Sequence, residues 1–196
     1  MLGPVVVIVE GVSDQVALEA LARRRGHDLD AEGVSIVPIG GAHSIGRFLE
    51  QLGQQRFELR LAGLCDAGEE CDFQRALERA GFGSDLTRAD MERLGFYVCE
   101  ADLEDELIRA LGTAAVEGVL EARGDLRSFR SFQKQLAQRG RTTERQLRRF
   151  MGTRSGRKAD YARALVDALE ATQAPRPLDR VLAHVWPDKA SPAPVG

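Results

Sequence analysis

Residues 5–14 read VVVIVEGVSD, and this stretch decides the fold class. The continuous β-branched run from Val5 to Val9 is typical of a strand buried on both faces, as in a parallel sheet. Gly11 follows the strand, and Ser13 can cap a helix that begins near Asp14. Apolar residues at helical spacing then continue until Gly26, which suits a helix end. The stretch therefore predicts a buried strand followed directly by a helix.

The same alternation of strand and helix recurs three times further along the chain. Apolar strands are expected at 34–39, 59–65 and 95–99, and helices follow them at 44–52, 71–80 and 102–111. Such alternation is the pattern of an α/β protein with right-handed crossovers. We therefore expect an open, mostly parallel four-stranded sheet flanked by helices.

No strand is expected after about residue 113. Helical patterns cover 126–138, 142–150, 157–172 and 177–186, followed by a proline-containing end. The sequence thus predicts an α/β domain at 1–122, a basic helical subdomain at 123–188 packed on one side of the sheet, and a flexible tail at 189–196.

Composition excludes several protein classes. With 43% hydrophobic and 29% charged residues among 196, the chain can bury a core and is not a disordered segment. No apolar run approaches the roughly 18 to 20 residues of a membrane helix, and the N-terminus has no basic region typical of a signal peptide. The three cysteines, Cys65, Cys71 and Cys99, form no CxxC pair. This argues against a disulfide scaffold or a structural zinc site and predicts a cytoplasmic protein.

Charge is strongly segregated along the chain. Residues 1–122 contain 11 Lys and Arg against 23 Asp and Glu, a net charge of −12, whereas residues 123–163 contain 13 against 3, a net charge of +10. Carboxylates that hold cations beside arginines that hold a polyanion would explain this pattern. Solvated helix faces are the alternative explanation, and the charge count alone leaves both open.

Acidic residues follow three of the four expected strands. They are Glu10 and Asp14, then Asp66 with Glu69 and Glu70, then Glu100, Asp102 and Glu104. Because ligands bind outside the carboxyl ends of parallel strands, these acids are expected to meet at one edge. Like charges gathered there need cations, and Mg²⁺ or Mn²⁺ suits carboxylate ligands. A favourable helix dipole would explain Asp14, Glu69 and Asp102 equally well, but it explains Glu10 poorly.

Four segments resemble a known family when read in order. The strand followed by Glu10, Gly11 and Asp14 resembles the first motif of the Toprim domain, and Asp66 lies where that domain carries an Asp-x-Asp motif. Residues 99–107, CEADLEDEL, and residues 154–159, RSGRKA, resemble later segments of the OLD (overcoming lysogenization defect) family nucleases. The resemblance spans roughly residues 1–170.

The resemblance implies a metal-dependent endonuclease that nicks or cleaves DNA with a pair of Mg²⁺ or Mn²⁺ ions. Glu10 would be a metal ligand or general base, Asp14 and Asp66 would bind the first ion, and Asp102 and Glu104 would help to bind the second. Lys158 would contact the scissile phosphate or stabilise developing charge.

Two departures from the family pattern affect these expectations. Gly68 stands where the second Asp of Asp-x-Asp is expected. Either Glu69 or Glu70 substitutes for it, or the second carboxylate comes from elsewhere in the chain, so the number of bound ions, one or two, is left open. OLD proteins also carry an ATPase domain before the Toprim domain, and this sequence has no phosphate-binding GxxxxGK[ST] loop. The chain is therefore not expected to hydrolyse ATP itself. Two questions are left open by the sequence: whether the chain works with a separate ATPase partner, and whether it self-associates.

The basic stretch predicts contacts with a nucleic-acid backbone. Arg139, Arg141, Arg154, Arg157 and Lys158 lie in or beside expected loops, from which they can reach phosphates. Pairing with the acidic half of the chain is the alternative for these side chains.

Two other functions compete with a nuclease. The first is a non-catalytic nucleic-acid-binding or regulatory module that depends on a partner, an interpretation supported by Gly68. The second is a phosphatase of haloacid-dehalogenase type with Asp66 as the nucleophile, but that class also expects an acid at position 68 and leaves Glu10 unexplained.

Overall fold

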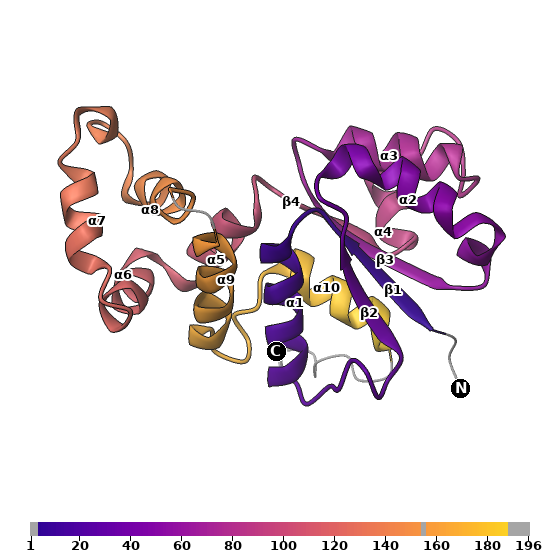
Figure 1. Cartoon of the computed structure of the whole chain (residues 1–196), viewed down its shortest axis with the longest axis horizontal. Coiled ribbons are helices and arrows are strands. Elements are labelled where there is room, and N and C mark those ends of the chain that lie inside the picture. The colour runs from indigo at the N-terminus through magenta and orange to yellow at the C-terminus, as the bar shows by residue number, and fades with distance from the viewer. Residues whose placement is uncertain (1–3, 154–155, 188–196) are drawn as a thin grey trace, which may run out of the picture.

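A computed structural model describes residues 4–153 and 156–187 (Figure 1). Its sheet has four strands, all parallel, in the order β2-β1-β3-β4. The strands are β1 (Val5–Val9), β2 (Val34–Pro38), β3 (Arg60–Asp66) and β4 (Phe96–Cys99). The predicted α/β class and open parallel four-stranded sheet are confirmed.

Helices cover both faces of this sheet. One face carries α2 (Ile45–Leu52), α3 (Glu70–Arg79) and α4 (Arg88–Arg93), and the other carries α1 (Val12–Arg24) and α10 (Arg176–Val185) (Figure 1). Short 3₁₀ turns span Ala42–Ser44 and Gly53–Phe57 before and after α2. The alternation of side chains along β1 explains the two layers, because Val7 packs into one apolar cluster and Ile8 into the other.

The remaining helices continue away from the sheet. They are α5 (Leu103–Leu111), α6 (Thr113–Ala122), α7 (Leu126–Gln133), α8 (Thr143–Met151) and α9 (Arg157–Ala168), with a 3₁₀ turn at Leu136–Gln138. Helices α6, α7 and α8 lie farthest from the sheet, whereas α9 returns to pack against α1 and α5 (Figure 1).

The apolar core does not divide at the expected boundary near residue 122. One cluster runs from Val7 in β1 through Leu107 in α5 to Phe129, Phe150 and Leu165 in the later helices. Helix α10 packs on β3 and β4, so the last helix belongs to the sheet layers and not to a separate helical unit. The tail expected at 189–196 lies outside the described residues.

Among the described residues, no helix has the length and apolar character needed to span a bilayer. Cys65 and Cys99 are buried and Cys71 is exposed, and all three thiols are free.

Candidate active site

The candidate site lies at the carboxyl ends of β1, β3 and β4. From β1 the chain crosses to β2 on one side, whereas β3 lies on the other side of β1. The order of the strands therefore reverses between β1 and β3, which is where open α/β sheets bind their ligands. Glu10 follows β1 and Asp66 ends β3, so the sheet brings these two acids to adjacent positions.

Glu10 is held by the neighbouring strand. The backbone N–H of Asp66 donates a hydrogen bond of 2.7 Å to Glu10 Oε1. Burial nevertheless raises the pKa of Glu10, and the nearby negative charges of Glu69 and Asp72 add to that rise. Glu10 thus points along the sheet edge toward Asp66, as the sequence predicted.

Asp14 lies in the first turn of α1 and is 9% exposed. Its Oδ2 accepts a 2.9 Å hydrogen bond from the backbone N–H of Gly11, which locks the turn between β1 and α1. Burial raises the pKa of Asp14 to about 7, although that hydrogen bond opposes the shift. Glu10 and Glu104 raise it further by repulsion.

Asp66 lies at the centre of the acidic edge. Burial raises its pKa to about 8, and four other carboxylates contribute. In order of effect these are Glu10, Asp14, Asp102 and Glu104. The acids expected at the ends of three different strands therefore do gather within electrostatic range of one another, as the sequence predicted.

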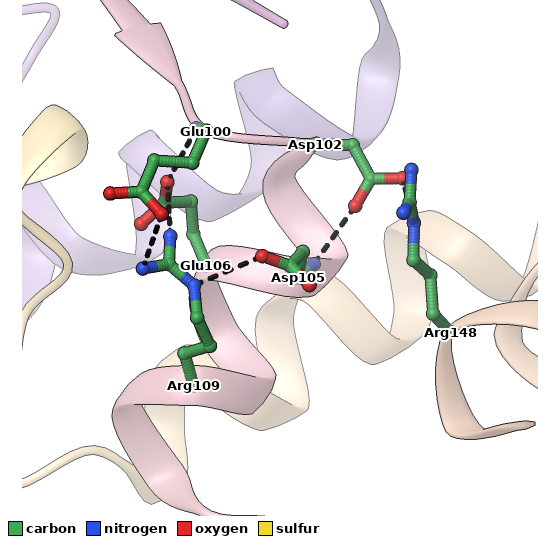
Figure 2. Close-up of polar contacts among 6 residues, drawn as sticks. All are labelled: Glu100, Asp102, Asp105, Glu106, Arg109 and Arg148. Carbon is green, nitrogen blue, oxygen red and sulfur yellow. Dashed lines mark hydrogen bonds and ion pairs between the residues drawn. The ribbon is translucent and has the colours of Figure 1, made fainter. Parts of the chain in front are cut away.

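Asp102 and Glu104 begin α5 on the helical side of this edge. Asp102 caps the helix, because its Oδ1 accepts a 2.9 Å hydrogen bond from the backbone N–H of Asp105. Its Oδ2 accepts a 2.5 Å bond from Nε of Arg148 in α8 (Figure 2). Glu104 is 4% exposed, and its Oε2 is 3.1 Å from Nζ of Lys158 in α9.

Lys158 keeps its proton in this setting. Burial opposes the charged form, but the attraction of Glu104 and Asp102 holds the pKa of Lys158 above its ordinary value. The other oxygen of Glu104, Oε1, is buried and has no hydrogen-bond partner among the described residues. An unpartnered buried carboxylate oxygen is costly, which suits a position that a cation completes.

Glu70 does not join the central acids. It begins α3 and forms a two-pronged ion pair with Arg88, in which Nε of Arg88 is 2.8 Å from Oε1 of Glu70. That pair holds the pKa of Glu70 below its usual range. Gly68 lies in the turn before α3, and a Cβ at this position would meet no atom within 4 Å.

The fit to a divalent ion differs among the acids. Among the described residues no three His, Cys, Asp or Glu side chains converge closely enough to hold one ion as they stand. The charge of Glu10, Asp14 and Asp66 nevertheless fits a cation, because all three have raised pKa values and none forms an ion pair in the described part of the chain. Asp102, Glu104 and Glu70 each already have a basic partner.

The predicted DNA-contacting arginines separate into two kinds. Arg139 and Arg141 lie exposed before α8, and Nε of Arg141 donates a 2.9 Å bond to the carbonyl of Ala137. Arg157 turns inward: its side chain is 10% exposed, and its terminal nitrogen lies 3.5 Å from Asp125. Its guanidinium also stacks on Phe150, so Arg157 stabilises the helical region. Arg154 lies outside the described residues.

Arg148 is the residue at the site that the sequence did not single out from the other arginines. Its contact with Asp102 joins positions 46 residues apart. Arg109 forms further ion pairs at this end of α5, with Glu100, Asp105 and Glu106 (Figure 2). No local spacing signals the Arg148 contact, which depends on how α8 packs against α5.

A parallel α/β sheet that gathers acids at the carboxyl ends of its strands is the arrangement expected of a Toprim-type fold. Residues 2–67 match the family model of the overcoming lysogenization defect protein-like Toprim domain. The expected resemblance to the Toprim domain of OLD proteins is confirmed.

Solved structures agree with this assignment at the level of the fold. The C-terminal region of the Burkholderia pseudomallei OLD protein is similar with a TM-score of 0.70 and 18% identity, covering 94% of this chain and 98% of that one. The C-terminal region of the Xanthomonas campestris pv. campestris OLD protein gives a TM-score of 0.68 and 21% identity, covering 93% and 92%. No functionally curated protein matches the sequence significantly.

Proposed function

We propose that this chain is a metal-dependent endonuclease that hydrolyses phosphodiester bonds of DNA. The observation that carries the proposal is the group of three carboxylates at the β1–β3 edge, Glu10, Asp14 and Asp66, which form no ion pair in the described part of the chain. The pKa values of Asp14 and Asp66, about 7 and about 8, reflect burial and the repulsion of neighbouring carboxylates. Perturbed acids at the ligand-binding edge of a parallel sheet are typical of a functional site.

Glu10, Asp14 and Asp66 are the residues that would hold Mg²⁺ or Mn²⁺. Such an ion supplies the positive charge that makes water a nucleophile near neutral pH and polarises a phosphoryl oxygen. It would also relieve the repulsion that now raises the pKa of Asp66. Oxygen donors of this kind suit a hard cation.

Lys158 supplies the second positive charge of the proposed mechanism, beside that of the metal ion. Its protonated ammonium group is about half exposed and is fixed by Glu104, so it can face a substrate and the acidic edge together. A fixed point charge stabilises the extra negative charge that develops on a phosphodiester under attack. Glu10, held by the N–H of Asp66, is positioned to bind the ion or to accept a proton.

DNA is the proposed substrate because exposed cations lie in the same helical region that supplies Arg148 and Lys158 to the site. Arg139 and Arg141 precede α8, the helix that also supplies Arg148 to the site. Contacts of this kind hold the phosphate backbone without reading bases, so we expect low sequence specificity.

The test is cleavage of supercoiled plasmid by the purified protein with Mg²⁺ or Mn²⁺. We expect nicked and linear products that disappear with EDTA and in Asp66→Ala. Cys71→Ala, a change at an exposed free thiol, is the matched control and should cleave normally. Thermal melting with Mn²⁺ measures binding separately, because an ion that binds only the folded state raises the melting temperature.

The competing function is a DNA-binding module without catalysis. It is favoured by the finding that no three acidic, His or Cys side chains of the described residues converge on one point. A salt-sensitive mobility shift of DNA, without cleavage and without stabilisation by Mn²⁺, would support that module. Stabilisation by Mn²⁺ without cleavage would instead point to an enzyme that needs a partner, such as a separate ATPase.

A further inference from the structure

The acids of the site fall into two groups by their partners. Glu10, Asp14 and Asp66 form no ion pair in the described part of the chain. Asp102 and Glu104, the acids expected to bind a second ion, are paired with Arg148 and Lys158. The helical region therefore places two protein cations where the sequence suggested a metal ion.

Both carboxylate oxygens of Asp102 already accept a hydrogen bond within the protein. Its Oδ1 accepts the backbone N–H of Asp105 at 2.9 Å, and its Oδ2 accepts Nε of Arg148 at 2.5 Å (Figure 2). The side chain of Asp102 is only 13% exposed, whereas that of Arg148 is 42% exposed. A charge-assisted hydrogen bond to a largely buried carboxylate is costly to break, which favours Arg148 over a competing ion.

The other expected ligands do not make up for Asp102. Glu70 is bound on both oxygens by Arg88, and position 68 carries a glycine. Glu104 has one oxygen on Lys158, which leaves only its Oε1 without a partner among the described residues. One free carboxylate oxygen is a poor donor set for a dedicated divalent-ion site.

We propose that the site holds a single divalent ion and that the guanidinium of Arg148 takes the place of a second one. This inference rests on the proposed metal-dependent function. Arg148 neutralises Asp102 through Nε, while its side chain remains 42% exposed. Its two terminal nitrogens have no hydrogen-bond partner among the described residues and are available to a substrate phosphate, for which the planar guanidinium is suited.

The number of bound ions tests this proposal without relying on activity. Isothermal titration calorimetry with Mn²⁺, checked by electron paramagnetic resonance of free Mn²⁺, should give one ion per wild-type chain. The double variant Arg148→Ala/Gly68→Asp should bind two, because it frees Asp102 and adds a carboxylate in open space. Arg149→Ala/Gly68→Asp is the matched control, since Arg149 is a neighbour on the same helix. It should still bind one ion.

Arg148→Lys gives a second, independent check that retains a cation at this position. It should bind one ion like the wild type, and thermal melting establishes that each variant is folded. Two ions in the wild type, or one ion in the Arg148→Ala/Gly68→Asp variant, would overturn the role of Arg148 but leave the nuclease proposal standing. No Mn²⁺ bound by the wild-type chain would overturn both.

Discussion

Asp66 is placed where function and stability oppose each other. Four carboxylates and burial raise its pKa to about 8, so its ionised form is disfavoured in the folded protein. An ion-binding site needs that ionised form, whereas the fold alone would be better served by a neutral side chain. The same conflict extends to Glu104, because burial raises the pKa of Glu104 although Lys158 opposes the shift.

We therefore expect Asp66→Asn to stabilise the ion-free protein while abolishing cleavage. Removing one charge from the cluster should raise the free energy of unfolding at pH 8 by about 1 kcal/mol after discounting for solvent screening. Urea denaturation in EDTA measures this change. Asp105→Asn, at a helix position paired with Arg109, serves as control and should not stabilise. A loss of stability in Asp66→Asn would show that the acids do not repel one another.

Stability should also depend on pH in a defined direction. The folded-state pKa values of Asp14 and Asp66 are about 7 and about 8, above the ordinary value of 3.8. The folded state thus binds more protons than the unfolded state between about pH 4 and pH 8, and stability falls as pH rises through that window. His184 acts in the opposite direction, because burial lowers its pKa.

Comparing the wild type with Asp66→Asn separates the effect of the carboxylates on stability from that of His184. In EDTA, the free energy of unfolding of the wild type should fall more steeply from pH 5 to pH 8 than that of Asp66→Asn, by on the order of 1 kcal/mol over the range. Both proteins contain His184, so its contribution cancels in the comparison. Parallel pH profiles would contradict the raised pKa of Asp66.

Residue-level prediction from sequence succeeded where the sheet dictates position. Glu10 and Asp66 end neighbouring parallel strands, so their meeting follows from strand order and the apolar pattern. The ion pair between Arg148 and Asp102 could not be predicted, because many arginines in the same stretch have equivalent local sequence. Which of them reaches α5 is decided by helix packing.

At the scale of elements, β3 must approach its neighbours unusually closely. A Cβ at Gly63 would lie 2.5 Å from Cδ1 of Phe96 in β4 and 2.9 Å from the carbonyl oxygen of Ile8 in β1. No ordinary Cβ contact is that short, so glycine is required for β3 to fit between β1 and β4. Since Asp66 ends this same strand, the packing at Gly63 also sets the position of the acidic edge.

Gly63→Ala should destabilise the protein by roughly 1–3 kcal/mol, the usual cost of overpacking a core. Chemical denaturation measures the decrease. Gly68→Ala, in the turn that follows β3, is the control, because its Cβ would meet nothing within 4 Å. Equal stability of the two variants would show that the sheet relaxes around Gly63 at little cost.

The strands were predicted closely, and the helices less so. Each of the four strands begins and ends within one residue of its expected bounds, because short apolar runs between polar segments are strong signals. Helices α4 and α6 were not predicted. Helix α4 is short, and α6 follows α5 across the single residue Gly112, so neither stands out as a separate periodic segment. Helix α9 ends at Ala168, four residues before its predicted end.

At the scale of the whole molecule, the segregated charges meet through specific pairs. Arg148 and Lys158 from the basic stretch bind Asp102 and Glu104 from the acidic part. This is why the boundary expected near residue 122 does not separate two independent cores: α8 and α9 pack onto α5 and α1, and their cations neutralise Asp102 and Glu104. Arg139 and Arg141 stay exposed and form no ion pair in the described part of the chain.

Those exposed cations should determine how strongly DNA binding depends on salt. Removing one cation that binds a phosphate reduces the slope of log K against log salt by about 0.9 on duplex DNA. Arg139→Ala/Arg141→Ala should therefore lower the slope by up to about 2 and weaken binding alike on different sequences. Fluorescence anisotropy with two unrelated duplexes over a range of NaCl concentrations measures both effects. Arg93→Ala/Arg176→Ala removes two arginines that pair with Asp90 and Glu92 beside the sheet, and it should leave the slope unchanged. If both double variants reduce the slope equally, DNA binds by overall charge and not through the helical region.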